Sequence, residues 1–208
     1  MKLYVLPLGA YQTNCYIVVD ENTKEALIVD PGSEAERVLQ VLEEYNLTPV
    51  KIILTHGHSD HIGAINGILE KYDLPIYIHK MDAACLADPK VNLSAFNGLG
   101  EVRITKEPEY IAEGDTITCG NIIFKVIETP GHTRGGVCFY SEDGIVLAGD
   151  TLFAGSVGRT DFPGGSMEVL VASIKNKLFT LPSNTKVYPG HGPGTTIANE
   201  IASNPFIY

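Results

Sequence analysis

Thr55-His56-Gly57-His58-Ser59-Asp60-His61 concentrates three histidines and one carboxylate in seven consecutive residues, in a chain that has six histidines in all. It directly follows an apolar run, residues 50–54, which predicts a buried strand. Where the chain leaves that strand in an extended conformation, side chains two residues apart point to the same side, so His56 and His58 are predicted to bind one ion together. Asp60 and His61 are predicted to lie in the first turn of a helix and to face a second ion. The apolar residues that indicate this helix by their spacing are Ile62, Ile65, Leu69 and Tyr72.

The donor groups of this stretch favour a transition-metal site. Imidazole and carboxylate together suit zinc, iron or manganese, and the absence of nearby cysteines argues against a structural cysteine site. The competing interpretation is a histidine-rich loop exposed to solvent, or a set of capping residues at a helix start. For one histidine that interpretation would usually hold. Four donors at ligand spacing directly after a strand favour the metal site instead.

Three further polar residues each follow an apolar strand and a glycine. They are His132 in Thr129-Pro130-Gly131-His132-Thr133, Asp150 in Leu147-Ala148-Gly149-Asp150-Thr151, and His191 in Tyr188-Pro189-Gly190-His191-Gly192. Glycine permits a tight turn and a close approach of the backbone. Taken singly, Asp150 could cap a turn and each histidine could be an ordinary hydrogen-bonded one. If the strands end at one rim, however, all three reach residues 56–61 and join one site. His79, whose neighbours show no ligand spacing, is predicted to be an ordinary histidine at a strand end.

Composition limits the class of protein. A chain of 208 residues with 44% hydrophobic content predicts a globular protein, and one domain spanning residues 1–208 is the simplest expectation. The net charge of −10 and the dispersal of the 15 Lys and Arg residues argue against a nucleic-acid partner.

Cysteine usage and hydropathy bear on location. The four cysteines are Cys15, Cys85, Cys119 and Cys138, and none forms a C-x-x-C pair. They are predicted to be reduced and mostly buried, as in a cytoplasmic protein. The first residues lack the pattern of a secretion signal, and no apolar run approaches the ~20 residues that span a bilayer, so no membrane association is expected.

The pattern of strands and helices forms two similar blocks. Strands are predicted at residues 2–8, 14–19, 26–29, 50–54, 74–78, 116–118, 122–127, 136–140, 145–148 and 186–188. A first helix is predicted after a capping box formed by Ser33 and Glu36, with a buried stripe that ends at Tyr45. Further helices are predicted at residues 81–87, after the cap residue Ser166, and at residues 197–202. Two sheets packed face to face with helices outside would bury these strands, which is an α+β architecture. Residues 88–109 are predicted to be a loop that either borders the active site or serves only as a connector.

The order of these motifs along the chain resembles that of a known family. The motifs T-H-G-H-S-D-H, P-G-H-T, A-G-D-T and P-G-H-G, in this order, resemble the metallo-β-lactamase superfamily, over residues 6–191. Residues 155–165, G-S-V-G-R-T-D-F-P-G-G, are similar to the glyoxalase II (hydroxyacylglutathione hydrolase) branch and its short relatives. The resemblance implies a four-layer αββα sandwich with a two-metal site at one rim. It implies that His56, His58 and His132 hold the first metal, that Asp60, His61 and His191 hold the second, and that Asp150 bridges both.

The chain also departs from full-length glyoxalase II. Only 17 residues follow His191, so the helical C-terminal domain that helps to bind glutathione there is expected to be missing. The tyrosine that the resemblance would place just beyond the last histidine is also absent, because Gly192-Pro193-Gly194 stands there. Arg159 occupies the position of a basic substrate contact in that branch, which makes it a candidate anion anchor. The alternative is a structural arginine paired with Asp161.

The activity that the resemblance implies is hydrolysis of a small thioester. Two divalent metal ions, with zinc expected and iron or manganese as alternatives, would generate a metal-bridging hydroxide that Asp60 orients as a catalytic residue. A mononuclear iron persulfide dioxygenase that uses only His56, His132 and Asp150 is a second reading, because that group also carries a G-R-T-D-F stretch. A lactone or ester hydrolase of the same superfamily and a non-enzymatic metal-binding protein are further alternatives. The acyl group, the thiol carrier and the oligomeric state stay open.

Overall fold

Two six-stranded sheets form the centre of the chain, in a computed structural model that describes residues 1–207. The first sheet follows chain order and contains β1 (Lys2–Leu8), β2 (Thr13–Val19), β3 (Glu25–Val29), β4 (Thr48–Ile53), β5 (Ile76–His79) and β6 (Glu109–Ile111). The second sheet has the order β14 (Thr195–Thr196), β13 (Lys186–Pro189), β10 (Ile145–Gly149), β9 (Val137–Ser141), β8 (Ile122–Glu128) and β7 (Thr116–Cys119). A small hairpin of β11 (Leu152–Phe153) and β12 (Ser156–Val157) lies beside them.

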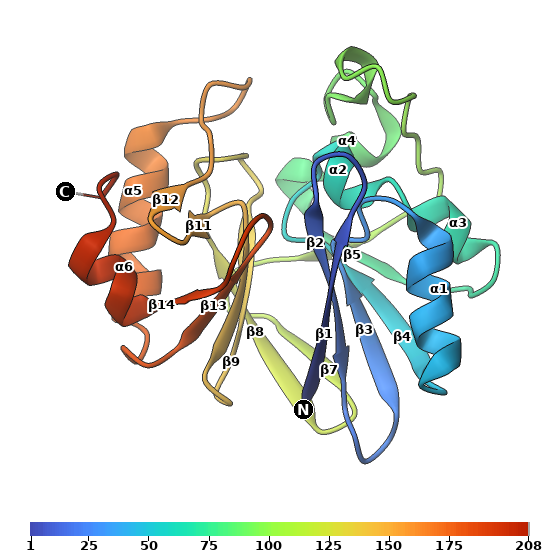
Figure 1. Cartoon of the computed structure of the whole chain (residues 1–208). Helices are drawn as coiled ribbons and strands as arrows, with labels where there is room; N and C mark the ends of the chain where they lie inside the picture. Colours follow the sequence, from blue (N-terminus) through green and yellow to red (C-terminus); the bar gives the residue numbers. More distant parts are fainter. Residues whose placement is uncertain (208) are drawn as a thin grey trace.

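The helices cover the outer faces of the two sheets. Figure 1 shows α1 (Ala35–Glu44) and α3 (Ile65–Leu69) outside the first sheet, and α5 (Met167–Asn176) and α6 (Ile197–Ser203) outside the second. The shorter helices are α2 (Ser59–Ile62) and α4 (Ala84–Ala87), with single 3-10 turns at Lys80–Asp82, Ser94–Phe96 and Leu178–Thr180.

Alternating side chains account for this layering. One set of strand residues packs between the sheets, including Val18, Leu27, Phe124 and Phe139. Their neighbours point the other way and pack under the helices, where Ile17 and Ile28 meet Val38 and Leu42 on one side, and Val146 meets Leu170 and Ile174 on the other. Because successive side chains of a strand face opposite sides, a strand covered on both sides is apolar throughout. The predicted four-layer α+β sandwich is confirmed.

Strand direction brings the candidate ligands to one rim. Strands β3, β4 and β5 run parallel in the first sheet, and β10 runs parallel to β13 in the second. Strand β8 is antiparallel to β9, which is antiparallel to β10, so β8 also points the same way as β10. The two sheets meet at this rim through a bridge between Thr13 and His191.

Two local predictions about the helices were wrong. Helix α1 begins at Ala35 after Glu34, which has a left-handed backbone (φ 52°) and no capping bond from its side chain, so the Ser33–Glu36 capping box does not form. The Glu34 carboxylate instead accepts hydrogen bonds from Gly9 N–H (2.6 Å) and Arg37 (2.9 Å). Tyr45 lies beyond the helix and is exposed. A backbone donor in the β1–β2 loop therefore displaced the local capping pattern.

The helix predicted after the histidine motif is divided in two. Helices α2 and α3 are separated at Gly63 and Ala64, where Ala64 N–H donates to Pro31 O, outside the helix, at 2.9 Å. The Ser166 cap was predicted correctly, since its hydroxyl accepts from Val169 N–H. The cysteines are all free and buried, as predicted. Within residues 1–207, no helix has the length and apolarity needed to cross a bilayer.

Candidate metal centre

The structure brings the seven predicted ligands together. His56 and His58 follow β4, Asp60 and His61 lie in α2, and His132, Asp150 and His191 follow β8, β10 and β13. The sixth histidine, His79, was predicted to be an ordinary one, and it pairs through Nε2 with Glu128 (3.1 Å).

Three histidines form one group, called here the three-histidine site. His56 Nε2 lies 3.1 Å from His58 Nδ1, and His132 Nε2 lies 2.9 Å from His58 Nδ1 and 3.3 Å from His56 Nε2. All three rings are buried. Three ring nitrogens that converge at these distances form a ready set of donors for one cation.

A second group, called here the acidic site, contains Asp60, His61 and His191. Asp60 Oδ2 lies 3.3 Å from His191 Nε2 and 3.7 Å from His61 Nε2. Asp150 reaches both groups, because its Oδ2 lies 3.6 Å from His132 Nε2 and 3.5 Å from His191 Nε2, while its Oδ1 lies 3.4 Å from His61 Nε2. Gly190 is required here, since a Cβ at that position would lie 2.1 Å from Asp150 Oδ1.

Asp30 is a functional residue that the sequence analysis missed. Its buried carboxylate accepts from Thr55 N–H (2.8 Å), Thr55 Oγ1–H (2.6 Å) and His61 Nδ1–H (3.0 Å). Because the Thr55 hydroxyl donates its one hydrogen to Asp30, it can only accept from His56 Nδ1, 3.1 Å away. Asp30 thus fixes both rings with Nε2 turned to the centre. Its strand–Asp–Pro–Gly setting repeats the strand-end pattern of the other ligands, which was the available signal.

Backbone carbonyls fix two more rings. His132 Nδ1 lies 2.7 Å from Arg159 O, and His191 Nδ1 lies 3.2 Å from Tyr11 O. A carbonyl oxygen can only accept, so each Nδ1 carries the proton and each Nε2 offers a lone pair to the centre. The backbone carbonyl that holds each Nδ1 therefore leaves Nε2 as the ring nitrogen available to a metal.

Charge separates the two groups. Burial, followed by the neighbouring histidines, lowers the pKa of His56 and lowers that of His58 to about 3. In the acidic site burial acts against the charged forms, but the carboxylates outweigh it and raise the pKa of His191 to about 9. Likewise, burial raises the pKa of Asp60, but His61 and His191 outweigh it and hold it at about 2. A metal at the acidic site must displace protons from these histidines, so its affinity falls as the pH falls.

The residues fit a metal. Among residues 1–207, His61 Nε2 and Asp150 Oδ1 are buried without a hydrogen bond of normal geometry. Burying such groups without a partner costs free energy, on the order of 1–3 kcal/mol each. A cation between them would satisfy both. Nitrogen and carboxylate donors are those that zinc, iron and manganese share, so the identity of the metal stays open.

A cavity of about 880 Å³ opens over the centre. His58, Asp60, His132, Asp150 and His191 form its polar floor. Its walls are largely apolar and aromatic, and include Tyr11, Leu93, Phe96, Phe153 and Phe162. The 88–109 loop therefore borders the site, as one of its two interpretations predicted. Buried Asn92 anchors this loop, because its carbonyl accepts from Ser59 N–H at 2.9 Å.

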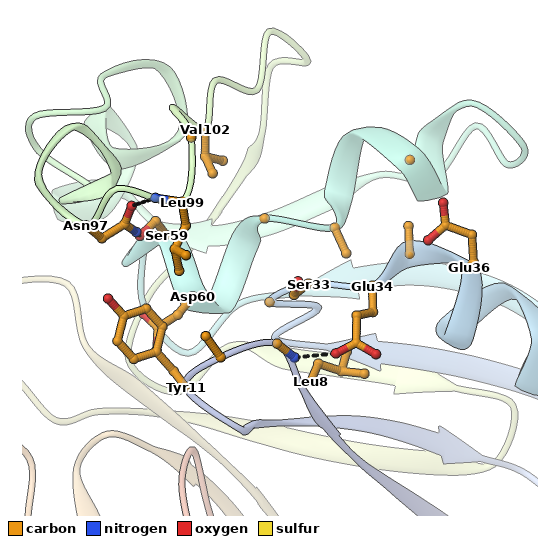
Figure 2. A pocket seen from close by; sticks show the side chains of 18 residues that line it. Leu8, Tyr11, Ser33, Glu34, Glu36, Ser59, Asp60, Asn97, Leu99 and Val102 are labelled. Carbon is orange, nitrogen blue, oxygen red and sulfur yellow. Dashed lines mark hydrogen bonds between the residues drawn. The ribbon is translucent and has the colours of Figure 1, made fainter.

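A smaller cavity of about 330 Å³ adjoins the first. The two share Tyr11, Ser59, Asp60 and Asn97. Figure 2 shows Tyr11 and Asp60 at one end of the smaller cavity and the two glutamates, Glu34 and Glu36, at the other. Asp60 therefore lies between the two cavities.

Arg159 lies in the wall of the large cavity and is already paired. Its Nε and Nη2 donate to the two carboxylate oxygens of Asp161 at 2.8 and 2.7 Å. Its guanidinium carbon lies 3.9 Å from the centre of the Phe162 ring, which in turn packs edge-on against His58. The alternative structural pairing is therefore present, although three of the five guanidinium N–H groups remain outside it.

Comparison with known proteins is consistent across sequence and structure. The family described as the metallo-beta-lactamase superfamily matches residues 8–191. The chain is 41% identical to the probable metallo-hydrolase YqgX of Bacillus subtilis, over 100% of this chain and 98% of that protein. It is 35% identical to the hydroxyacylglutathione hydrolase GloC of Haemophilus influenzae, over 100% of this chain and 98% of that protein.

Solved structures agree with the fold. BLEG-1, described as a B3 metallo-beta-lactamase, superimposes with a TM-score of 0.94 at 39% identity, over 99% of both chains. TTHA1623 in a di-iron-bound form gives 0.88 at 40% identity, over 98% of this chain and 99% of the other. ETHE1 from Myxococcus xanthus gives 0.81 at 31% identity, over 99% and 84%.

Proposed function

The chain belongs to the metallo-β-lactamase superfamily, and we propose that it is a metal-dependent hydrolase of small thioesters of the hydroxyacyl-thiol kind. The observation that carries the proposal is the pairing of two donor groups that share Asp150 at the floor of one cavity. The hydroxyacylglutathione hydrolase GloC, similar over its length, supports a thioester rather than another acyl compound.

The proposed roles follow the geometry. His56, His58 and His132 would hold one divalent ion, Asp60, His61 and His191 would hold a second, and Asp150 would serve both donor groups. Bound there, two divalent cations lower the pKa of a water molecule toward neutrality and polarise the substrate carbonyl. Zinc is the proposed metal, although the similar TTHA1623 was seen with two irons.

Asp60 is the proposed catalytic carboxylate. Its Oδ2 accepts from Thr13 Oγ1–H at 3.1 Å, which fixes the carboxylate over the floor of the large cavity. From that position it orients the attacking water toward the acyl carbon. A thiolate leaves without being protonated, so the reaction needs no general acid. The apolar walls exclude water from the rest of the substrate.

The decisive experiment measures thiol release and oxygen consumption with the same preparation. We expect a hydroxyacyl-glutathione thioester to release thiol without oxygen uptake. A persulfide is offered in parallel, because the similar protein ETHE1 (31% identity) is a persulfide dioxygenase. The G-R-T-D-F motif around Arg159 does not separate thioester hydrolysis from persulfide dioxygenation. Oxygen uptake on the persulfide, with one iron per chain and no thiol release from the thioester, would replace the hydrolase by a dioxygenase. A lactone and a simple ester are also tested, because a lactone or ester hydrolase of the same superfamily is the remaining alternative.

Arg159→Ala is predicted to weaken binding of an anionic substrate. The N–H groups left free by Asp161 are the proposed donors to a substrate carboxylate, and a hydrogen bond to a charged group contributes about 1.5–3 kcal/mol. Since Asp161 already neutralises part of the charge, we expect KM to rise about 10-fold for an anionic thioester, with kcat little changed.

A neutral thioester is the control substrate for this variant, and its KM should not change. Equal effects on both substrates would show that Arg159 only orders its loop through Asp161, and a lower melting temperature would point the same way. Metal content is measured in each preparation to exclude loss of the ions.

A further inference from the structure

Two buried polar side chains outside the set of metal ligands each contact one half of the metal centre. They are Asp82, at the end of the turn Lys80–Asp82, and Asn14, at the start of β2. Asp82 is 3% exposed and Asn14 is 4% exposed. Neither lies among the candidate ligands, and polar groups buried to this degree need a structural reason.

Asp82 ties together the two loops that carry the three-histidine site. Its Oδ2 accepts from Gly57 N–H at 3.2 Å, and its Oδ1 accepts from Gly135 N–H at 2.7 Å. Gly57 stands between His56 and His58, and Gly135 stands three residues after His132. One carboxylate thus holds the β4 loop and the β8–β9 loop at a fixed separation.

Both glycines stand where a side chain would not fit. A Cβ at Gly135 would lie 2.6 Å from Asp82 Oδ1, and a Cβ at Gly57 would lie 2.3 Å from the Cβ of Cys85. Both distances are shorter than real Cβ contacts. Gly135 therefore leaves room for the Asp82 carboxylate itself, and Gly57 lets the histidine loop pack on Cys85 beside it.

Asn14 plays the same part for the acidic site. Its Nδ2 donates to Pro189 O (3.0 Å) and Gly192 O (2.9 Å), and its backbone N–H donates to Gly190 O (2.7 Å). These three bonds enclose His191 on both sides. The preceding residue, Thr13, donates to Asp60 Oδ2, so the start of β2 contacts two members of the acidic site.

The chemistry of each side chain matches its partners. Asp82 faces two N–H donors and must offer two acceptors, whereas Asn14 Nδ2 faces two carbonyl acceptors and must offer two donors. The isosteric swaps reverse this match. Asp82→Asn turns an amide N–H₂ against a backbone N–H, and Asn14→Asp turns an oxygen against two carbonyl oxygens. Each swap keeps the shape of the side chain, reverses its hydrogen bonds and changes its charge by one unit.

We propose that Asp82 and Asn14 are separate positioning residues, Asp82 for the three-histidine site and Asn14 for the acidic site. The inference rests on the metal sites of the proposed function and adds that each half of the centre has its own buried support. Loss of such an outer support typically lowers metal affinity about 10- to 100-fold. The expected effect is therefore selective for one site.

The test uses zinc affinity, measured by competition with a chromophoric chelator, in two single-site backgrounds. His191→Ala isolates the three-histidine site, and His58→Ala isolates the acidic site. We expect Asp82→Asn to weaken zinc about 10- to 100-fold in the His191→Ala background and less than about 3-fold in the other, with the reverse for Asn14→Asp. Each swap is thus the matched control of the other, and no turnover is needed.

Selectivity between the sites is the criterion. A swap that merely destabilises the fold weakens zinc binding at both sites together, and this outcome would overturn the inference. Melting temperatures of the metal-free proteins show such destabilisation independently. Unchanged affinity at both sites would overturn it as well. Where a swap fails to fold, Asp82→Ser and Asn14→Ser are judged by the same ratio. A wild-type chain that binds two zinc ions but no thioester would remove the proposed reaction and leave this inference standing.

Discussion

Asp150→Ala is expected to abolish activity and to deplete both metal ions at once. Asp150 contacts the three-histidine site through His132 and the acidic site through His61 and His191. Removing a single stabilising donor from an active site commonly costs 10²–10³ in kcat, and here the lost group serves two ions. We therefore expect kcat/KM to fall by on the order of 10³-fold or more, equivalent to about 4 kcal/mol.

Metal analysis of purified variants checks this expectation. The comparison variant is His191→Ala, which should lose chiefly the ion of the acidic site. This variant keeps His56, His58 and His132, whose ring nitrogens lie 2.9 to 3.3 Å apart in the wild-type chain. Circular dichroism should show that both variants are folded. If Asp150→Ala retained two ions per chain, Asp150 would not bridge the sites.

Removal of the metals from the wild-type chain is expected to have the second largest effect. A strong chelator should abolish turnover and also lower the melting temperature. A ligand present at 100 times its dissociation constant stabilises the folded state by about 2.7 kcal/mol, so two independent sites contribute about 5 kcal/mol. For a domain of this size the corresponding drop in melting temperature is about 10–20 °C.

Reconstitution identifies the working metal. Zinc, manganese and iron(II) are added back separately, the last without oxygen, and thiol release is measured for each. We expect zinc to restore both the melting temperature and turnover. Oxygen uptake on a persulfide when the iron(II)-loaded protein is returned to air, with no thiol release from the thioester for any metal, would favour the dioxygenase. Turnover that persists in chelator-treated, metal-free protein would contradict any metal-dependent mechanism.

The sequence singled out the seven candidate ligands because each carries a local signature. His132, Asp150 and His191 all follow an apolar strand and a glycine, and the parallel course of those strands then brings them to one rim. Asp30 has the same strand-end setting but was interpreted only as the end of a strand. Asp30 orients His61 and Thr55, which are distant from it in sequence and contact it only in the folded chain.

Other features depend on contacts that no local pattern contains. The capping box at Ser33 was wrong because Glu34 found a backbone donor at Gly9, 25 residues earlier. Strands β6, β11, β12 and β14 have two or three residues each and were not predicted, since so short a run has no measurable alternation. Asn14 and its partner Pro189 are 175 residues apart. Such pairings become visible only when both sheets are in place.

The order of the ligands along the chain has a consequence for how the protein is made. The histidine motif leaves the ribosome early, but the three-histidine site lacks His132 until β8 of the second sheet has been made, and the acidic site lacks His191 until β13 has been made. Neither donor set is complete on a nascent first half. A complete donor set for either metal therefore exists only after the two sheets have come together.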